Sequence, residues 1–227
     1  MKVFTAILLS MFAATKSNVQ LKTVEERLQE FGDVVRDRLA PQFEAAGVEY
    51  PPTRLTFIGI KHDRVLEVRA FESSGDSRFI CRYPILAASG GLGPKLREGD
   101  RQVPEGVYRV RELNPNSVYH LSIWLDYPNE SDWSRAAEEG RTEPGSEIMI
   151  HGDERSSGCI AVGDEAVEDL FVLAALVGIE KVSVILTPVD FRQQSFAPPV
   201  DAPGWTAQLY ERIAEALSAH KTPGSIQ

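Results

Sequence analysis

A histidine and a cysteine eight positions apart are the residues of this chain that best fit covalent chemistry. They are His151 and Cys159, in the stretch IMIHGDERSSGCIAVGDEAVEDL over residues 148–170. A free thiol is only slightly ionised at neutral pH, so a nucleophilic cysteine needs a base or a lowered pKa, and an imidazole within hydrogen-bond reach supplies either. The pair therefore predicts thiol-based nucleophilic catalysis, the alternative for a lone cysteine being a small buried apolar residue.

The residues around the pair predict how the backbone presents it. Residues 147–150 read as a strand that brings His151 to its carboxyl end, and a well-capped helix is expected over residues 164–177. The cysteine precedes that helix by a few residues, where peptide dipoles favour an anion. Gly158 leaves room for a substrate carbonyl beside the sulfur, so the amides of Gly158 and Cys159 are candidates for binding an oxyanion.

The rest of the pattern predicts a β-rich domain between helical ends. Thr23-Val24-Glu25-Glu26 is a capping box followed by apolar residues every three to four positions, which predicts a helix over residues 23–46 that Pro41 should bend or split. From residue 54 the apolar period falls to about two, which predicts short strands. These strands are expected over residues 55–60, 65–71, 78–86, 107–110, 119–125 and 182–186, with further helices over 131–139 and 205–220.

Two segments are too rich in glycine or proline to belong to the core. Residues 88–104 contain four glycines, two prolines and five charged side chains, so we expect a long loop with a functional role. Residues 196–204 are proline-rich and read as a linker or clamp before the last helix.

The charge balance and the cysteine count exclude several kinds of partner and site. With 24 Lys and Arg against 33 Asp and Glu the net charge is -9, and the basic residues are scattered, which argues against nucleic acid. Two cysteines without a CxxC pair cannot build a zinc ribbon. Asp153 and Glu154 have no partner at metal-ligand spacing, so neither a metal nor another cofactor is predicted. Cys81 reads as a core residue, with a Cys81–Cys159 bridge as the alternative.

The amino terminus carries the pattern of a secretory signal. Lys2 precedes twelve mostly apolar residues, 3–14, which are too few to span a bilayer, and small residues lie at the end of this stretch. Residues 1–16 are therefore predicted to be a signal peptide, with the protein exported to the periplasm or cell envelope. The alternative is an amphipathic first helix of a cytoplasmic protein, and the lack of a polar face counts against it.

Three separated motifs carry a family resemblance. They are HGDERSSGCIAVGDEAVEDLF over residues 151–171, GLGPKLREGDRQVPEGVYRV over 91–110 and LNPNSVYHLSIWLDYPN over 113–129. In this order they resemble the YkuD-domain L,D-transpeptidases, in particular the YafK-like murein branch, and the resemblance covers about residues 55–188. It implies a β-rich α+β fold: a YkuD-like β-sandwich catalytic domain over residues 51–190, with an N-terminal helical segment over 17–50 and a proline-rich segment and C-terminal helix over 191–227.

The resemblance also implies roles for the pair. Cys159 would attack the carbonyl at the L-centre of a diaminopimelate residue in a peptidoglycan stem peptide, releasing the terminal D-amino acid or another amine. His151 would be the base, and the carbonyl of Gly152 would orient its imidazole, as in a triad with a backbone atom in the third role. Carbapenems, which acylate this family, are expected to acylate the same cysteine.

The chain departs from the commoner family pattern, which reads S-H-G-C with Arg or Asn two positions after the cysteine. Here Ser157 replaces that histidine, and Ala161 stands at the Arg or Asn position. Tyr119 and His120 are therefore hypothesised to supply substitute polar contacts. The alternative for His120 is a half-buried side chain that pairs with a neighbouring strand.

Arginines in the flanking loops suit a substrate rich in carboxylates. Arg97 and Arg155 would bind such groups through their guanidinium forks, although exposed arginines also serve solubility. The predicted oxyanion and substrate-binding residues are Gly158, Ser157, His120, Tyr119, Arg155 and Arg97.

The sequence thus predicts a cell-envelope cysteine acyltransferase of the L,D-transpeptidase type, with peptidoglycan stem peptides as its partner. Hydrolysis is the alternative reaction, either as an L,D-carboxypeptidase or as an endopeptidase that cuts peptidoglycan or a lipoprotein–peptidoglycan link. A third possibility, from another class, is an inactive peptidoglycan-binding module.

Overall fold

The described strands form one continuous mixed sheet. The computed structural model describes residues 20–72 and 75–222, so the predicted signal peptide over residues 1–16 lies outside the described residues. In this part of the chain the strand order is β3-β2-β1-β9-β5-β6-β7-β8-β4. The strands are β1 Leu55–Ile60, β2 Val65–Phe71, β3 Ser77–Pro84, β4 Ala87–Ala88, β5 Gly106–Asn114, β6 Ser122–Leu125, β7 Met149–His151, β8 Ile160–Ala161 and β9 Val182–Thr187.

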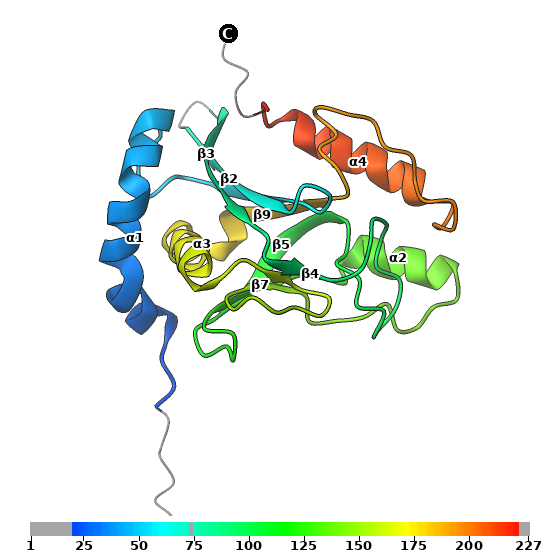
Figure 1. The fold of residues 1–227 in the computed structure, drawn as a ribbon, viewed down its shortest axis with the longest axis horizontal. Coiled ribbons are helices and arrows are strands. Elements are labelled where there is room, and N and C mark those ends of the chain that lie inside the picture. Colours follow the sequence, from blue (N-terminus) through cyan, green and yellow to red (C-terminus); the bar gives the residue numbers. More distant parts are fainter. Residues whose placement is uncertain (1–19, 73–74, 223–227) are drawn as a thin grey trace, which may run out of the picture.

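Strand pairing divides the sheet into two halves that share β5. β1, β2 and β3 form the antiparallel meander that the alternating pattern predicts. β9 is central in the sheet, because it runs parallel to β1 on one side and antiparallel to β5 on the other. β5 pairs with β9 on one side and with β6 on the other, so the sheet curls without a break (Figure 1).

Helices cover both faces of this sheet (Figure 1). α1 Val24–Ala46 packs on α3 Asp164–Val177 on one face, and α4 Thr206–Ser218 packs on β5 and β9 on the other. α2 Glu130–Glu138 follows β6, and the 3-10 turn η1 Ile179–Lys181 leads from α3 into β9. No helix within residues 20–72 and 75–222 is long and apolar enough to cross a membrane.

β1 is buried throughout because both of its faces are covered. Leu55 and Phe57 lie in the core that α1 and α3 complete, whereas Ile58 and Ile60 lie in the core under α4. Side chains alternate along a strand, so a strand between two helical layers needs apolar residues at consecutive positions.

Most predicted elements are confirmed, and with them the β-rich α+β fold class. α1 has the expected capping box, in which Thr23 accepts from the Glu26 amide, and β1, β2 and α3 have the predicted bounds. The sequence predicts that Pro41 should bend or split the first helix, and the split is wrong, because α1 continues through Pro41 as one helix of 23 residues that packs on α3.

The predicted strand over residues 119–125 is too long. It begins only at Ser122, because His120 has a left-handed φ of 72° that interrupts extended backbone. The strand predicted over 107–110 extends to Asn114, and the one over 78–86 ends at Pro84. β4 and β8 were not predicted, since two residues carry no periodic signal.

Candidate active site

His151 is the last residue of β7 and is only 1% exposed. The residue that follows it holds its ring in place. Nδ1 donates to the Gly152 carbonyl at 2.6 Å. A carbonyl oxygen can only accept, so Nδ1 carries the proton and Nε2 carries the free lone pair. Burial lowers the pKa of His151, against the opposing effects of the Gly152 carbonyl and Asp153. The imidazole at neutral pH is therefore a neutral base with a fixed tautomer.

The position after the histidine has no room for a side chain. A Cβ on Gly152 would lie 2.5 Å from Asp164 Oδ1 and 2.6 Å from the Tyr119 carbonyl. The Gly152 amide donates to Leu121 at 3.2 Å, and the His151 carbonyl accepts from Val162 at 3.0 Å. Glycine thus lets the segment before β6, the start of α3 and the histidine pack closely enough to fix the orienting carbonyl.

Cys159 directly precedes β8, the parallel neighbour of the strand that ends on His151. In this pairing Ile150 lies opposite Ile160 and His151 opposite Ala161. Continued by one residue, the same register aligns Cys159 with Met149, two positions before His151. The pairing of β7 with β8 thus brings the backbone segments of the two predicted catalytic residues side by side.

The Cys159 thiol is held in its protonated form. Its Sγ donates to the Glu147 carbonyl at 3.5 Å. Burial raises the pKa of Cys159, a Met149 backbone hydrogen bond and Lys95 act to lower it, and Glu147 adds to the rise. A protonated thiol beside a neutral imidazole requires general-base activation during attack.

The amides predicted to bind an oxyanion already have partners. The Gly158 amide donates to Ser89 Oγ at 2.6 Å, and the Cys159 amide donates to Ser156 Oγ at 3.0 Å. An oxyanion at either amide would therefore have to displace a serine hydroxyl. Sequence reasoning missed both serines: Ser89 lies 69 positions away with no local signal, whereas the S-S-G-C spacing could have indicated Ser156.

Tyr119 and His120 point to different parts of the structure. The Tyr119 ring stacks on His151, with centroids 4.3 Å apart. His120 Nε2 instead lies 2.9 Å from Glu168 Oε1 of α3, and its ring meets Phe31 of α1 edge-on at 5.5 Å. Tyr119 thus joins the candidate site, while the His120 ring contacts helices.

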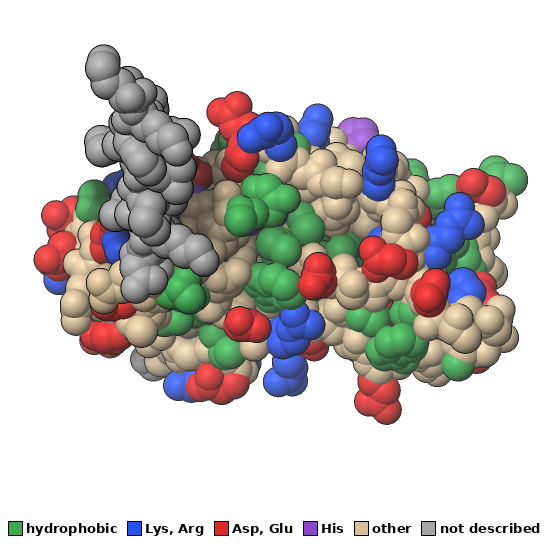
Figure 2. Space-filling model, turned by 90° about the horizontal axis from the view of Figure 1, so that it is seen from below, with side chains coloured by type: hydrophobic (Ala, Val, Ile, Leu, Met, Phe, Trp, Pro, Cys, Tyr) green, Lys and Arg blue, Asp and Glu red, His purple; other side chains and the backbone are tan. Residues whose placement is uncertain are grey.

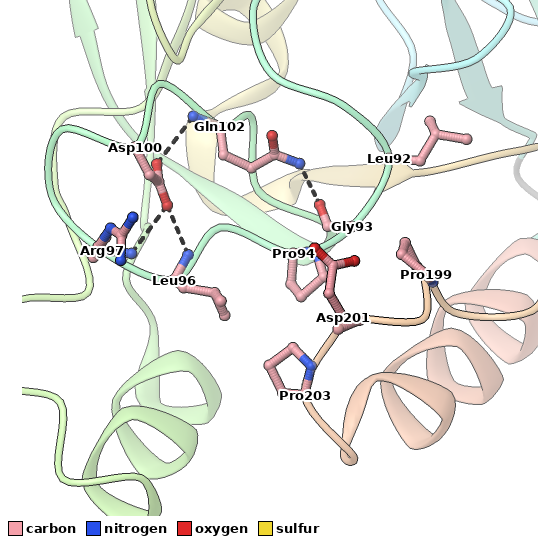
Figure 3. Close-up of a pocket in the computed structure, with 11 residues that line it drawn as sticks. Leu92, Gly93, Pro94, Leu96, Arg97, Asp100, Gln102, Pro199, Asp201 and Pro203 are labelled. Carbon is pink, nitrogen blue, oxygen red and sulfur yellow. Dashed lines mark hydrogen bonds between the residues drawn. The ribbon is translucent and has the colours of Figure 1, made fainter.

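The remaining predicted substrate-binding side chains face solvent. Ser157 is exposed, and Arg155 is exposed with its guanidinium 3.3 Å from Asp153. Arg97 lines a cavity of about 260 Å³ between the glycine-rich loop and the proline-rich segment. Figure 3 shows Asp201 of the proline-rich segment across this cavity from the loop.

Both ends of the loop over residues 88–104 are fastened to the domain. The buried Lys61 ammonium donates to the carbonyls of Gly93 at 3.0 Å and Val103 at 2.9 Å, and to Glu105 Oε1 at 2.9 Å. Glu105 also accepts from Tyr210 of α4 at 2.9 Å. This clamp was not predicted, since its members are far apart in sequence.

The cysteines and charges of the described residues limit the chemistry of the site. Cys81 and Cys159 are both free, so the alternative of a bridge between them is wrong. Burial raises the pKa of Cys81 to about 11, as expected of a core thiol.

In the described residues no cluster of three or more His, Cys, Asp and Glu side chains is arranged to hold a metal ion. On the face shown in Figure 2, basic and acidic side chains are interspersed.

Residues 66–185 match the family model of the YkuD L,D-transpeptidase catalytic domain. The protein named "Putative L,D-transpeptidase YafK" from Escherichia coli K12 is 41% identical to this chain over 118 residues. That alignment covers 50% of this chain and 44% of the relative, so the chain spans less than half of the relative's length.

Two solved structures show a weaker likeness. Pgp2, a helical cell shape determining protein from Campylobacter jejuni, is 26% identical, with 74% of this chain and 56% of that chain covered and a TM-score of 0.49. L,D-transpeptidase 1 of Mycobacterium tuberculosis is 12% identical, with 59% and 62% covered and a TM-score of 0.35. The family model matches more than half of the 227 residues, from β2 to β9 with both His151 and Cys159, and this chain therefore belongs to the YkuD family of L,D-transpeptidase catalytic domains.

Proposed function

We propose that the chain is a cell-envelope L,D-transpeptidase that acts on peptidoglycan stem peptides through a Cys159 acyl-enzyme. The observation that supports this proposal is the hydrogen bond that orients the His151 ring. His151 has its Nδ1 proton committed to the Gly152 carbonyl at 2.6 Å, which leaves Nε2 as a free base, and the strand that ends on His151 runs beside β8, which follows Cys159. Nucleophile, base and orienting group are the three parts that acyl transfer needs.

In the first half-reaction Nε2 of His151 removes the thiol proton as the sulfur of Cys159 attacks the carbonyl carbon at the L-centre of diaminopimelate. The carbonyl π electrons move onto oxygen. When that oxyanion collapses, the C–N bond breaks, the imidazolium gives its proton to the leaving D-amino acid, and a thioester remains. Tyr119, stacked on the ring, restricts its rotation through both proton transfers.

The acceptor decides the second half-reaction. An amine that gives its proton to His151 as it attacks the thioester yields a cross-link, and the sulfur leaves with the electrons of the C–S bond and is reprotonated. Water in the same place yields hydrolysis, which would make the chain an L,D-carboxypeptidase or an endopeptidase acting on peptidoglycan or on a lipoprotein linked to it. Arg97 and Arg155, both exposed, are proposed to bind the carboxylates of the peptide, with Ser157 and Gly158 lining the approach to the sulfur.

Mass spectrometry of the protein incubated with tetrapeptide and cross-linked muropeptides tests the proposal. We expect loss of the terminal D-residue in the native protein and none in Cys159→Ala or His151→Ala. A new cross-link would assign transfer, and a free acid would assign hydrolysis. A carbapenem adduct on Cys159 is the independent check of the acyl-enzyme. Absence of both product and adduct would favour the inactive peptidoglycan-binding module.

A further inference from the structure

A buried lysine packs against the segment that leads into β7, close to the backbone that contacts the nucleophile. Lys95 belongs to the loop over residues 88–104, yet its residue is only 8% exposed. Its Nζ donates to Asp100 Oδ1 at 2.5 Å and to the Arg97 carbonyl at 3.0 Å. Moving an ammonium out of water is costly even when it is paired, so a buried lysine in an otherwise polar loop requires an explanation.

The Lys95 side chain packs against the segment that holds the thiol. A Cβ on Gly145 would clash with Lys95 Cε, so only glycine permits this contact. Two residues further on, the Glu147 carbonyl accepts from the Cys159 thiol at 3.5 Å. The lysine stem therefore supports the backbone that positions the sulfur.

Further hydrogen bonds join the loop to this segment. The Glu98 amide donates to the Glu143 carbonyl at 2.9 Å, and Arg141 Nη1 donates to the Leu96 carbonyl at 2.6 Å. On the other side of the cysteine, Ser89 accepts from Gly158 and donates to the Arg101 carbonyl at 2.7 Å. The loop is thus joined both to the segment before β7 and to the residue before Cys159, and these bonds fix where its lysine lies.

The loop does not depend on the lysine for its shape. Asp100 accepts hydrogen bonds from the backbone amides of Leu96, Arg97 and Gln102, at 2.9, 3.0 and 3.0 Å (Figure 3). These bonds remain when Lys95 is replaced. A substitution at Lys95 can therefore change the charge near Cys159 while the turn around Asp100 persists.

We propose that Lys95 is a positioning residue whose buried ammonium favours negative charge on the Cys159 sulfur during proton transfer to His151. Two charged side chains act on the thiol: Lys95 from the loop, whose ammonium is paired with Asp100, and Glu147 from the segment before β7. Lys95 acts to lower the pKa of the burial-raised thiol, and Glu147 acts against it. The inference rests on the proposed function, in which this sulfur attacks and later leaves.

The test is the pH dependence of Cys159 alkylation by iodoacetamide from about pH 6 to about pH 12, read by peptide mapping so that Cys81 is scored separately. We expect Lys95→Met and Lys95→Gln to move the midpoint up by about one pH unit, the usual effect of losing a nearby opposite charge. Lys95→Arg should keep the native midpoint. Glu147→Gln should move it down by less, because that side chain is exposed.

Controls separate charge from folding. Lys181→Met makes the same chemical change at an exposed, remote position and should leave the midpoint unchanged. Thermal unfolding reports whether each variant folds. If Lys95→Met does not fold, the alkylation midpoint of Lys95→Gln is the one that tests the inference. An unshifted midpoint in the folded neutral variants would overturn the inference, as would failure of both to fold, because Lys95 would then be a folding residue.

Alkylation requires no peptidoglycan, so it also separates this inference from the proposed function. A shifted midpoint with no muropeptide product would reject the proposed reaction and keep the role of Lys95 toward Cys159. Product formation with an unshifted midpoint would support the proposed reaction and reject the role of Lys95 toward Cys159.

Discussion

The ring of Tyr119 lies on the ring of His151, with centroids 4.3 Å apart and planes inclined by 30°. No covalent neighbour imposes this contact, since 32 positions separate the two residues. It holds the imidazole from one face while the Gly152 carbonyl holds it at Nδ1. Together these contacts leave Nε2 as the atom that can exchange protons.

Replacing Tyr119 by leucine should lower kcat/KM for muropeptide acylation by about fivefold, since an aromatic pair contributes about 1 kcal/mol beyond its buried area. Tyr119→Phe keeps the ring and should retain nearly the native value. The measurement is the initial rate of terminal D-residue release. Equal rates in the leucine and phenylalanine variants would show that stacking does not orient the base.

Adding one methyl group at Gly152 should destabilise the fold. Gly152→Ala places a Cβ against Asp164 Oδ1 and the Tyr119 carbonyl, and overpacking of this kind costs about 1 to 3 kcal/mol. Gly32→Ala is the matched control, because this helical position has no atom within 4 Å of the added Cβ and should gain about 0.5 to 1 kcal/mol. Urea unfolding measures both, and a neutral Gly152→Ala would contradict the close packing.

His120→Ala should lower stability by about 1 kcal/mol, because it removes the contact with Glu168 and the edge-on contact with Phe31. Glu168→Gln should cause part of the same loss. The informative comparison is unfolding free energy against the acylation rate of fully folded protein. A lower acylation rate with unchanged stability would support the hypothesis that His120 binds substrate.

Lys61→Met should destabilise the protein by about 3 kcal/mol, since it leaves the carboxylate of Glu105, which is 1% exposed, without its cation. The double variant Lys61→Met, Glu105→Gln removes both charges and should recover part of the loss. Thermal unfolding measures the two. An equal loss in both variants would show that the clamp acts through packing rather than through its ion pair.

His220 should make stability depend on pH. The Nδ1 atom of His220 lies 2.6 Å from Ser77 Oγ. Burial and the charges of Arg69, Arg192 and Arg54 lower the pKa of His220 from 6.5 to about 4. Between these values the unfolded chain binds a proton that the folded protein excludes, so the free energy of unfolding falls as the pH decreases from 6.5 to 4.

The comparison with His220→Asn isolates this effect. Asp132, whose pKa burial raises to about 6, titrates in the opposite sense, because its folded state binds the proton more readily. The expected result in urea unfolding is therefore a native-minus-variant difference that declines between pH 6.5 and 4 and is constant outside that range. A difference independent of pH would mean that His220 does not titrate as described.

The sequence by itself determined the local elements of this protein. The capping box at Thr23, the short apolar runs over residues 55–60 and 65–71 and the glycines at both ends of α3 act over a few residues, so each could be read without the fold. The short stretch with His151, Gly152 and Cys159 likewise contained the histidine and the carbonyl that orients it, since Nδ1 bonds to the next residue.

Only the tertiary structure decided which distant groups surround that stretch. Ser89 accepts from the Gly158 amide and Tyr119 stacks on His151, while Lys95 acts on the thiol of Cys159 through its charge, and all three lie in other loops. Their contacts depend on strand order and on the close approach of backbone segments. No periodicity or spacing along the chain encodes either, because both arise from the packing of the whole sheet.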